Sequence, residues 1–259
     1  ITSVNLALTN GTGLASNYSI NSQTVDITGR PVTISGSRSY DSTTTADSSI
    51  LSITSGVSGE SLSLTGSGIL GSASAGTQSI TNNNTLAIAD GTGLASNYTL
   101  SGATMNVTVI PRTLNVTLSR EYDGTTNVTT ASLTPIFDSL QGGETLALSG
   151  TGSVSNANAE SSKAVTLGTI ALAAGSGNPS NYTINSVLLD VTQRVINLDG
   201  IRAYNATTNV LSSDINTFGN IVSGETLTIS GTGSVSTDSV EMNKAITLGT
   251  LSLGNGSGV

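Results

Sequence analysis

The sequence predicts an all-β protein made of tandem β-sandwich repeats, and three observations lead to that prediction. Aliphatic and polar residues alternate at period two, for example in Met105–Ile110 and Leu114–Leu118. Such alternation places one face of a strand on a core and the other in solvent. No stretch keeps a 3.6-residue period, so we expect very little helix. One short pattern also returns at a fixed interval, with Tyr40, Tyr122 and Tyr204 each 82 positions apart.

Other residues recur at about the same interval as these three tyrosines. A Gly-Glu pair followed by Ser or Thr and then Leu occurs once per interval, at Glu60, Glu144 and Glu225. An Asn-Tyr pair also recurs, at Tyr18, Tyr98 and Tyr182. All six tyrosines and all eight basic residues lie on this grid. A period of this size indicates a tandem array of one structural unit.

The period divides the chain into four segments. Two are complete repeats, 30–111 and 112–193, whereas 1–29 matches the C-terminal part of a repeat and 194–259 the N-terminal part. We therefore expect both ends of the chain to lie inside a repeat and the natural protein to be longer. Only Ile110-Pro111-Arg112 and Thr192-Gln193-Arg194 join the last predicted strand of one repeat to the first of the next. A join this short predicts a stiff, elongated rod.

The elements of a complete repeat follow from local sequence. Asn-Gly at Gly11 and Asp-Gly at Gly91 predict turns, because these dipeptides tolerate positive φ. The segment Thr24–Thr28 is expected to be the last strand of the partial repeat. Six or seven short strands are typical of a β-sandwich, with a barrel as the alternative. Strands of the first complete repeat are expected near 31–37, 49–54, 60–66, 78–81, 85–89 and 97–109.

Composition excludes several classes of function. The chain has no Cys, His or Trp, so disulfides, thiolate metal sites and nucleophilic triads that use His or Cys cannot form. The net charge of −8 argues against nucleic-acid binding, and no apolar run approaches the roughly 20 residues of a membrane span. The sixteen acidic residues are scattered without a calcium-binding loop, and two Phe cannot line a glycosidase cleft. We expect no catalytic activity, no cofactor and no metal.

The recurring polar and aromatic residues form a repeat signature that we expect to be structural. The Asp or Asn after each tyrosine should accept backbone hydrogen bonds in an Asx turn, Gly124 should form a tight corner, and the tyrosine should pack over the core edge. The alternative is a small ligand-binding patch of Tyr, Asp and Arg. We also expect each arginine to stack on its tyrosine or to pair with the repeated glutamate. The signature residues are Arg38, Tyr40, Asp41, Glu60, Arg120, Tyr122, Asp123, Gly124, Glu144, Arg202, Tyr204, Asn205 and Glu225.

The stretch Tyr122–Thr126, preceded by Arg120 and followed by Gly143-Glu144, resembles the YDG repeat domain of large bacterial surface proteins. Those proteins look like filamentous-haemagglutinin-type adhesins, many of them exported by two-partner secretion, and the MBG-like repeats share the pattern. The resemblance covers the whole chain as two complete and two partial copies, with departures at Ser42, Asn205 and Ala206. It implies an immunoglobulin-like sandwich used as a stalk or matrix module, and it identifies no catalytic residue.

Two functions are expected of such an array. The first is a non-catalytic, stiff stalk of a secreted or cell-surface bacterial adhesin, whose repeats contact their neighbours and project binding regions. The alternative is a biofilm-matrix or filament-forming protein whose repeats bind like chains or extracellular polysaccharide, which low charge and exposed strand edges favour. Both place the chain outside the cell or on the bacterial cell surface. An enzyme is the third and least supported candidate.

Overall fold

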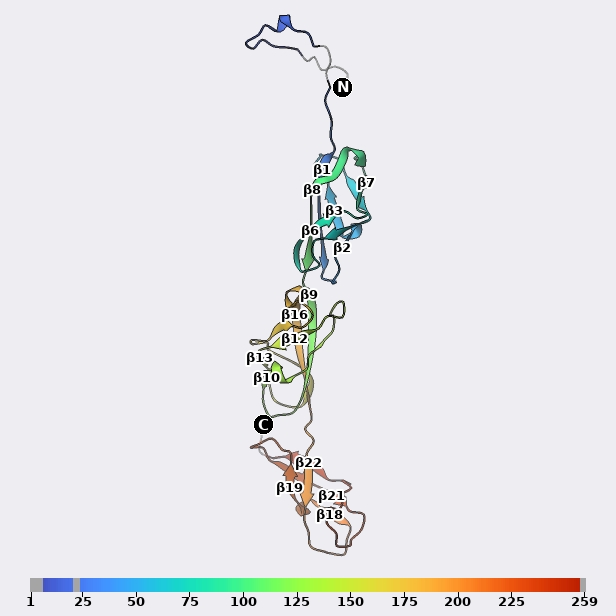
Figure 1. Cartoon of the computed structure of the whole chain (residues 1–259). Helices are drawn as coiled ribbons and strands as arrows, with labels where there is room; N and C mark the ends of the chain where they lie inside the picture. The colour runs from blue at the N-terminus through green and yellow to red at the C-terminus, as the bar shows by residue number, and fades with distance from the viewer. Residues whose placement is uncertain (1–6, 21–23, 257–259) are drawn as a thin grey trace. The chain divides into compact units, whose positions relative to one another are not determined.

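The structure, a computed structural model, describes residues 7–20 and 24–256 (Figure 1). Within them the regular elements are β-strands and short 3₁₀ helices, joined by loops, and there is no α-helix. The all-β prediction is therefore confirmed. The chain divides into two compact units. The first unit comprises Ile1–Gly36, Thr45–Leu70 and Ser79–Val107, and the second comprises Ser37–Thr44, Gly71–Gln78 and Thr108–Val259.

Residues 30–111 form one large sheet and one small ladder. The strands are β1 (Arg30–Ser39), β2 (Thr45–Asp47), β3 (Leu51–Thr54), β4 (Leu62–Thr65), β5 (Ser67–Leu70), β6 (Gly76–Asn82), β7 (Ala87–Asp90) and β8 (Tyr98–Ile110). The sheet has the order β2-β5-β6-β8-β1-β3, and β4 pairs with β7. Alternation along β1 buries Val32 and Ile34 and leaves Thr33 between them exposed, as the sequence pattern predicts.

Residues 112–193 repeat this arrangement with smaller sheets. The strands are β9 (Arg112–Glu121), β10 (Asn127–Thr129), β11 (Ile136–Phe137), β12 (Leu146–Ser149), β13 (Thr151–Ser153), β14 (Glu160–Ala164), β15 (Ala171–Ala174) and β16 (Tyr182–Thr192). A four-stranded sheet has the order β11-β9-β16-β14, and β10 pairs with β13 and β12 with β15. The first and last strands of the repeat, β9 and β16, run parallel.

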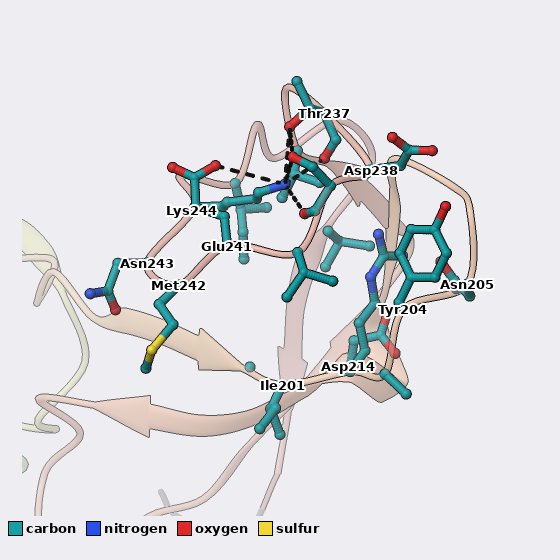
Figure 2. Close-up of a pocket in the computed structure, with 18 of the residues that line it drawn as sticks. Ile201, Tyr204, Asn205, Asp214, Thr237, Asp238, Glu241, Met242, Asn243 and Lys244 are labelled. Atoms are coloured by element: carbon teal, nitrogen blue, oxygen red, sulfur yellow. Dashed lines mark hydrogen bonds and ion pairs between the residues drawn. The ribbon is translucent and has the colours of Figure 1, made fainter.

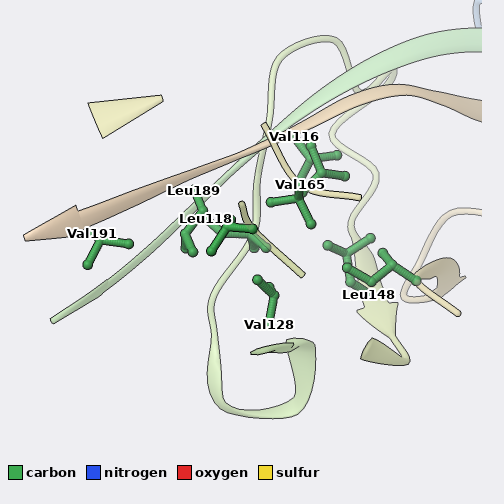
Figure 3. Close-up of a cluster of buried hydrophobic side chains, with 10 residues drawn as sticks. Val116, Leu118, Val128, Leu148, Val165, Leu189 and Val191 are labelled. Atoms are coloured by element: carbon green, nitrogen blue, oxygen red, sulfur yellow. The ribbon is translucent and has the colours of Figure 1, made fainter. Parts of the chain in front are cut away.

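The core of the second repeat is centred on this parallel pair (Figure 3). Val116 lies opposite Val187, and Leu118 lies opposite Leu189. All four side chains are at most 2% exposed. A fully buried Val or Leu contributes about 1.5–3 kcal/mol relative to an exposed one. The last strand therefore closes the core that the first strand begins.

A glycine corner separates a predicted strand from one that the sequence did not predict. The strand expected at 60–66 is present as β4, but a further strand, β5, follows directly after Gly66 and belongs to a different sheet. Gly66 has φ +75°, and its counterpart Gly150, between β12 and β13, has φ +93°. A Cβ on Gly150 would lie 2.2 Å from the carbonyl oxygen of Thr169. Only glycine allows this conformation and approach, which lets one segment serve two sheets.

In each repeat, one long side chain donates a hydrogen bond to a backbone carbonyl of the loop that precedes it in sequence. The Nζ of Lys163, a buried residue, donates to the Asn158 carbonyl oxygen at 2.9 Å. In the first repeat the Nε2 of Gln78 donates to the carbonyl of Ser74, also at 2.9 Å. Lys244 makes the matching bond in the third repeat. The lysine amine therefore works here as a hydrogen-bond donor that an amide can replace.

Residues 194–256 form three two-stranded ladders. The strands are β17 (Asn197–Gly200), β18 (Asn209–Leu211), β19 (Ile215–Gly219), β20 (Leu227–Ser230), β21 (Thr232–Ser234) and β22 (Ser252–Asn255). β17 pairs with β19, β18 with β21, and β20 with β22. Among these residues no strand takes the position that β16 holds in the second repeat.

The predicted strand Thr24–Thr28 is absent, which corrects the expectation for the partial repeat. These residues have no strand assignment and are all exposed. Val25 and Ile27 are 82% and 92% exposed. A single extended segment without a paired neighbour has no ladder to stabilise it.

Candidate functional site: a tyrosine–glutamate clasp

The signature stretch forms the same loop in all three repeats, and its arginine holds that loop. The guanidinium Nη2 donates to the backbone carbonyl of the residue five positions later, at 2.5 Å for both Arg120 and Arg202. Arg38 makes the same bond. Arg120 also lies 3.1 Å from the carboxylate of Asp123, and Arg38 pairs with Asp41. Each arginine is therefore used within its own loop.

The expected Asx turn is present in each loop. The Oδ1 atoms of Asp123 and Asn205 accept the backbone N–H two residues later, at 3.0 and 3.3 Å. Asn205 thus preserves the turn while losing the carboxylate charge. The following residue is left-handed in every copy, with φ of 65° at Ser42, 74° at Gly124 and 58° at Ala206.

The proposed pairing of these arginines with the repeated glutamates is wrong. Within the described part of the chain, Glu60, Glu144 and Glu225 form no ion pair. Each of them instead accepts a hydrogen bond from a tyrosine hydroxyl. The guanidinium groups are already bonded to carbonyl oxygens of their own loops, so a neutral phenol supplies the donor to each glutamate.

The most buried of these contacts lies entirely within the second unit, and we call it the clasp. The hydroxyl of Tyr40 donates to Glu144 Oε1 at 2.5 Å, and the hydroxyl of Tyr182 donates to Oε2 at 2.5 Å. The two rings meet edge to face with centroids 5.3 Å apart. Tyr40 and Tyr182 are 3% and 4% exposed. One carboxylate thus receives two phenols, one from the Tyr40 loop and one from β16.

Two further contacts surround the clasp. Asn181, which precedes Tyr182, is buried and accepts the backbone N–H of Ala75 through Oδ1 at 2.9 Å. Gly142 has φ +57°, and a Cβ there would lie 2.9 Å from the Ser42 hydroxyl. The Asn-Tyr and Gly-Glu patterns, which recur far apart in sequence, therefore meet the tyrosine loop at one place.

The clasp shifts the titration of its phenols. Burial, together with the hydrogen bond to Glu144, raises the pKa of Tyr40 to about 12. The same two causes raise the pKa of Tyr182. A phenolate beside a carboxylate is unfavourable because the two negative charges repel. The contact therefore requires that both phenols stay neutral.

The Tyr40–Glu144 contact of the clasp recurs one period later, with a single phenol, and we call it the second clasp. The hydroxyl of Tyr122 donates to Glu225 Oε1, and this hydrogen bond, with burial, raises the pKa of Tyr122. A Cβ on Gly124 would lie 2.9 Å from Val222, so the signature glycine leaves room for this approach. Arg194, at the start of the third repeat, lies 3.5 Å from the carboxylate of Glu121.

The remaining signature residues do not join two repeats. Glu60 accepts from the hydroxyl of Tyr98 in its own repeat, just as Glu144 accepts from Tyr182. Tyr204 projects from the third loop and is 64% exposed. Tyr40 and Tyr122 therefore have repeated glutamates as partners, whereas the Tyr204 ring is largely in solvent.

A comparison of the sequence with models of protein families identifies the family of this chain. A model of the YDG domain matches residues 27–107 and again residues 108–188, as two adjacent copies. The chain belongs to the YDG domain family. Tyr40 comes from the first YDG copy, and Glu144 and Tyr182 come from the second. Comparison with curated proteins and with solved structures gives no match.

Sequence reasoning missed the second half of the YDG clasp. Tyr98 and Tyr182 are absent from the predicted signature, although the Asn-Tyr pair recurs as regularly as the others. Their role becomes visible only when the fold brings them to the Gly-Glu turn. Among the described residues no group of three or more acidic side chains could hold a metal ion. None of the described helical segments has the length and apolar character needed to cross a membrane.

Proposed function

We propose that this chain is a non-catalytic structural region of a large secreted or cell-surface bacterial adhesin. Its YDG repeats, each with an immunoglobulin-like sandwich fold, would form a stiff stalk that projects binding regions located elsewhere in the protein. The observation that carries this proposal is the clasp of Tyr40, Glu144 and Tyr182, in which side chains of two successive YDG copies share one carboxylate. Such a contact restricts movement between the copies that contribute to it.

The burial of the tyrosines supports a stalk over a glycan-binding array. Binding to sugars by aromatic stacking requires exposed rings, but Tyr40 and Tyr182 are 3% and 4% exposed. Their hydroxyls are also bonded to Glu144. Tyr40 and Tyr182 therefore serve a contact inside the protein, whereas the rings of Tyr18 and Tyr204 are 70% and 64% exposed.

Small-angle X-ray scattering of the full chain tests the stiffness on which the stalk depends. We expect a narrow distribution of conformations for the natural sequence and a broader one for the double variant Tyr40→Phe, Tyr122→Phe, because it lacks both inter-repeat hydroxyls. Tyr18→Phe is the control, since Tyr18 is 70% exposed. Broad bending of the natural chain would contradict the proposal.

The second candidate is a matrix or filament protein whose copies associate. The exposed aliphatic residues of the third repeat favour it, because Ile201, Val240 and Met242 are 78%, 87% and 86% exposed. Surfaces of this kind mark contacts between proteins. Sedimentation velocity over a wide concentration range separates the two candidates, since only the second requires larger species at higher concentration.

A further inference from the structure

The first and last strands of the second repeat, β9 and β16, form a long parallel pair of ten residue positions. Arg112 lies opposite Tyr182 at one end of this parallel pair. Glu121 lies opposite Thr192 at the other end. The backbone N–H of Tyr122 donates to the Thr192 carbonyl at 2.9 Å, which extends the contact beyond the end of β9. The two strands through which the chain enters and leaves the repeat are therefore bonded directly to each other.

Tension along the chain loads this parallel pair in shear. The first repeat joins β9 at Arg112, and the third repeat follows β16 after Thr192. Because the strands run parallel, these two points lie at opposite ends of the pair, roughly 30 Å apart at the rise of a strand. A pull on both points therefore draws the strands past each other along their length. The hydrogen bonds between them are then loaded together and not one after another.

The buried side chains of the parallel pair oppose such sliding. Val116 lies opposite Val187, and Leu118 lies opposite Leu189, and all four belong to the core of the repeat (Figure 3). Successive side chains of a strand point to opposite faces of the sheet. A slip of one residue would therefore turn the buried set of one strand away from the core. Movement along the pair thus costs the burial of apolar surface as well as hydrogen bonds.

Neither strand of the parallel pair is at an edge of its sheet. The order β11-β9-β16-β14 places the pair at the centre. On one side Phe137 of β11 lies opposite Val116 of β9. On the other side Lys163 of β14 lies opposite Leu189 of β16. Both outer strands run antiparallel to the strand that they flank. Removing either β9 or β16 from the sheet therefore breaks two ladders of hydrogen bonds.

Asn115 spans the point where the parallel pair becomes irregular. The register shifts between Ile184 and Ser186, so Asn185 is an extra residue in β16. Asn115 Oδ1 accepts from the side-chain amide of Asn185 and from the hydroxyl of Ser186, both at 2.8 Å. Its Nδ2 donates to Asp138 Oδ2 at 2.7 Å, directly after β11. One side chain thus links three strands at the place where a bulge disrupts the ladder.

A lysine holds the strand that flanks β16. Lys163 lies in β14, and its Nζ donates to Asn156 Oδ1 at 2.6 Å and to the Asn158 carbonyl at 2.9 Å. The third repeat has the same tie, in which the Nζ of Lys244 donates to the Thr237 carbonyl at 2.9 Å (Figure 2). The loop before β14 is thus fastened to that strand, which supports the outer side of the parallel pair.

We propose that the second repeat is a force-bearing unit, which resists tension along the chain through the parallel pair of β9 and β16. The first repeat has a similar arrangement, because β1 and β8 are neighbours in its sheet. The N–H of Tyr40, just after β1, donates to the Ile110 carbonyl at 2.8 Å, as Tyr122 does to Thr192. The inference deepens the proposed stalk and rests on it for the source of the tension, since a stalk held at both ends is pulled along its length.

Pulling the second repeat in two directions tests this role. The chain contains no cysteine, so DNA handles for optical tweezers can be attached to the full chain at introduced cysteines. Thr113→Cys, Gln193→Cys holds the parallel pair at opposite ends, whereas Thr126→Cys, Gln193→Cys holds it at one end. All three residues are exposed. The first geometry should require a severalfold higher unfolding force, because it loads the ladder together while the second opens it pair by pair.

A variant of Asn115 makes the test specific. Asn115→Ala should lower the unfolding force in the first geometry and leave the second nearly unchanged, because opening begins at the other end of the parallel pair. Asn127→Ala is the matched control, since Asn127 is exposed on β10 outside the pair. Equal forces in the two geometries would overturn the proposal. So would a first-geometry force that falls as much in Asn127→Ala as in Asn115→Ala.

This experiment fails independently of the scattering test of the stalk. A high force in the first geometry, in a chain whose scattering shows broad bending, would support the force-bearing repeat and contradict the stiff stalk. Equal forces in the two geometries, in a chain with a narrow distribution of conformations, would support the stalk and overturn the force-bearing role of β9 and β16.

Discussion

The hydroxyl of Tyr40 and the carboxylate of Glu144 are 104 positions apart in sequence and 2.5 Å apart in space. The second oxygen of the same carboxylate accepts from Tyr182 at 2.5 Å. Two neutral donors thus share one carboxylate as acceptor. Removing either donor leaves part of a carboxylate without its partner, and such a loss costs more than the bond itself contributes.

Tyr40→Phe should lower the free energy of unfolding by about 1–3 kcal/mol, because Glu144 Oε1 loses its donor while the ring packing is kept. Urea denaturation of the full chain measures the change. Tyr18→Phe should have no effect, since Tyr18 is 70% exposed. Equal stability of the two variants would mean that the Tyr40 hydroxyl contributes nothing to folding.

Stability should fall at high pH because of the same contact. The pKa of Tyr40 is raised to about 12, from about 10 in an unfolded chain. A raised pKa means that the folded state favours the protonated phenol. The contribution is therefore complete below about pH 10 and is lost as pH rises towards about 12. Denaturation midpoints measured across this range should fall less steeply in Tyr40→Phe than in the natural chain.

Gly150→Ala should destabilise the second repeat strongly. The residue has φ +93°, and its Cβ would lie 2.2 Å from the Thr169 carbonyl oxygen, so the corner between β12 and β13 would have to move away from Thr169. We expect a loss of about 2 kcal/mol or more. Gly143→Ala is the control, because Gly143 also has positive φ but nothing lies within 4 Å of its Cβ position. The difference between their thermal midpoints isolates the clash from the backbone strain.

Lys163→Gln should be tolerated better than Lys163→Ala. Gln78 fills the same role in the first repeat by donating to a loop carbonyl at 2.9 Å, which shows that an amide suffices. Alanine would leave the Asn158 carbonyl and Asn156 Oδ1 without this donor, at a cost of about 1–3 kcal/mol. Chemical denaturation of the three proteins compares them. If both variants lose the same stability, the positive charge and not the hydrogen bond is what matters.

The regular part of this fold could be predicted from sequence, because strand alternation and duplication are both local or periodic signals. The burial of Val32 and Ile34 follows from the pattern along β1. The strand β5 beyond Gly66 could not be predicted in the same way, since a glycine at the end of an alternating run marks either the end of a strand or a corner that leads into another. The parallel pairing of β9 with β16 depends on the whole topology of the repeat.

The clasp could be predicted only in part for a similar reason. Recurrence identified Tyr40 and Glu144 as belonging to the repeat, but it assigned the wrong partner to the glutamate. An ion pair with Arg38 was the simpler expectation from charge. The structure uses that guanidinium for the loop backbone instead, and loop geometry cannot be read from the spacing of charged residues.

The division of each clasp between successive repeats has a consequence for how the array unravels. A repeat with neighbours on both sides contributes a tyrosine to one clasp and a glutamate to another, so its unfolding disrupts two contacts. A repeat with one neighbour disrupts only one. In a nearest-neighbour system of this kind, melting begins at the outermost units and advances inward. Pulling on such an array should therefore release length in steps of one repeat, with interior repeats yielding last.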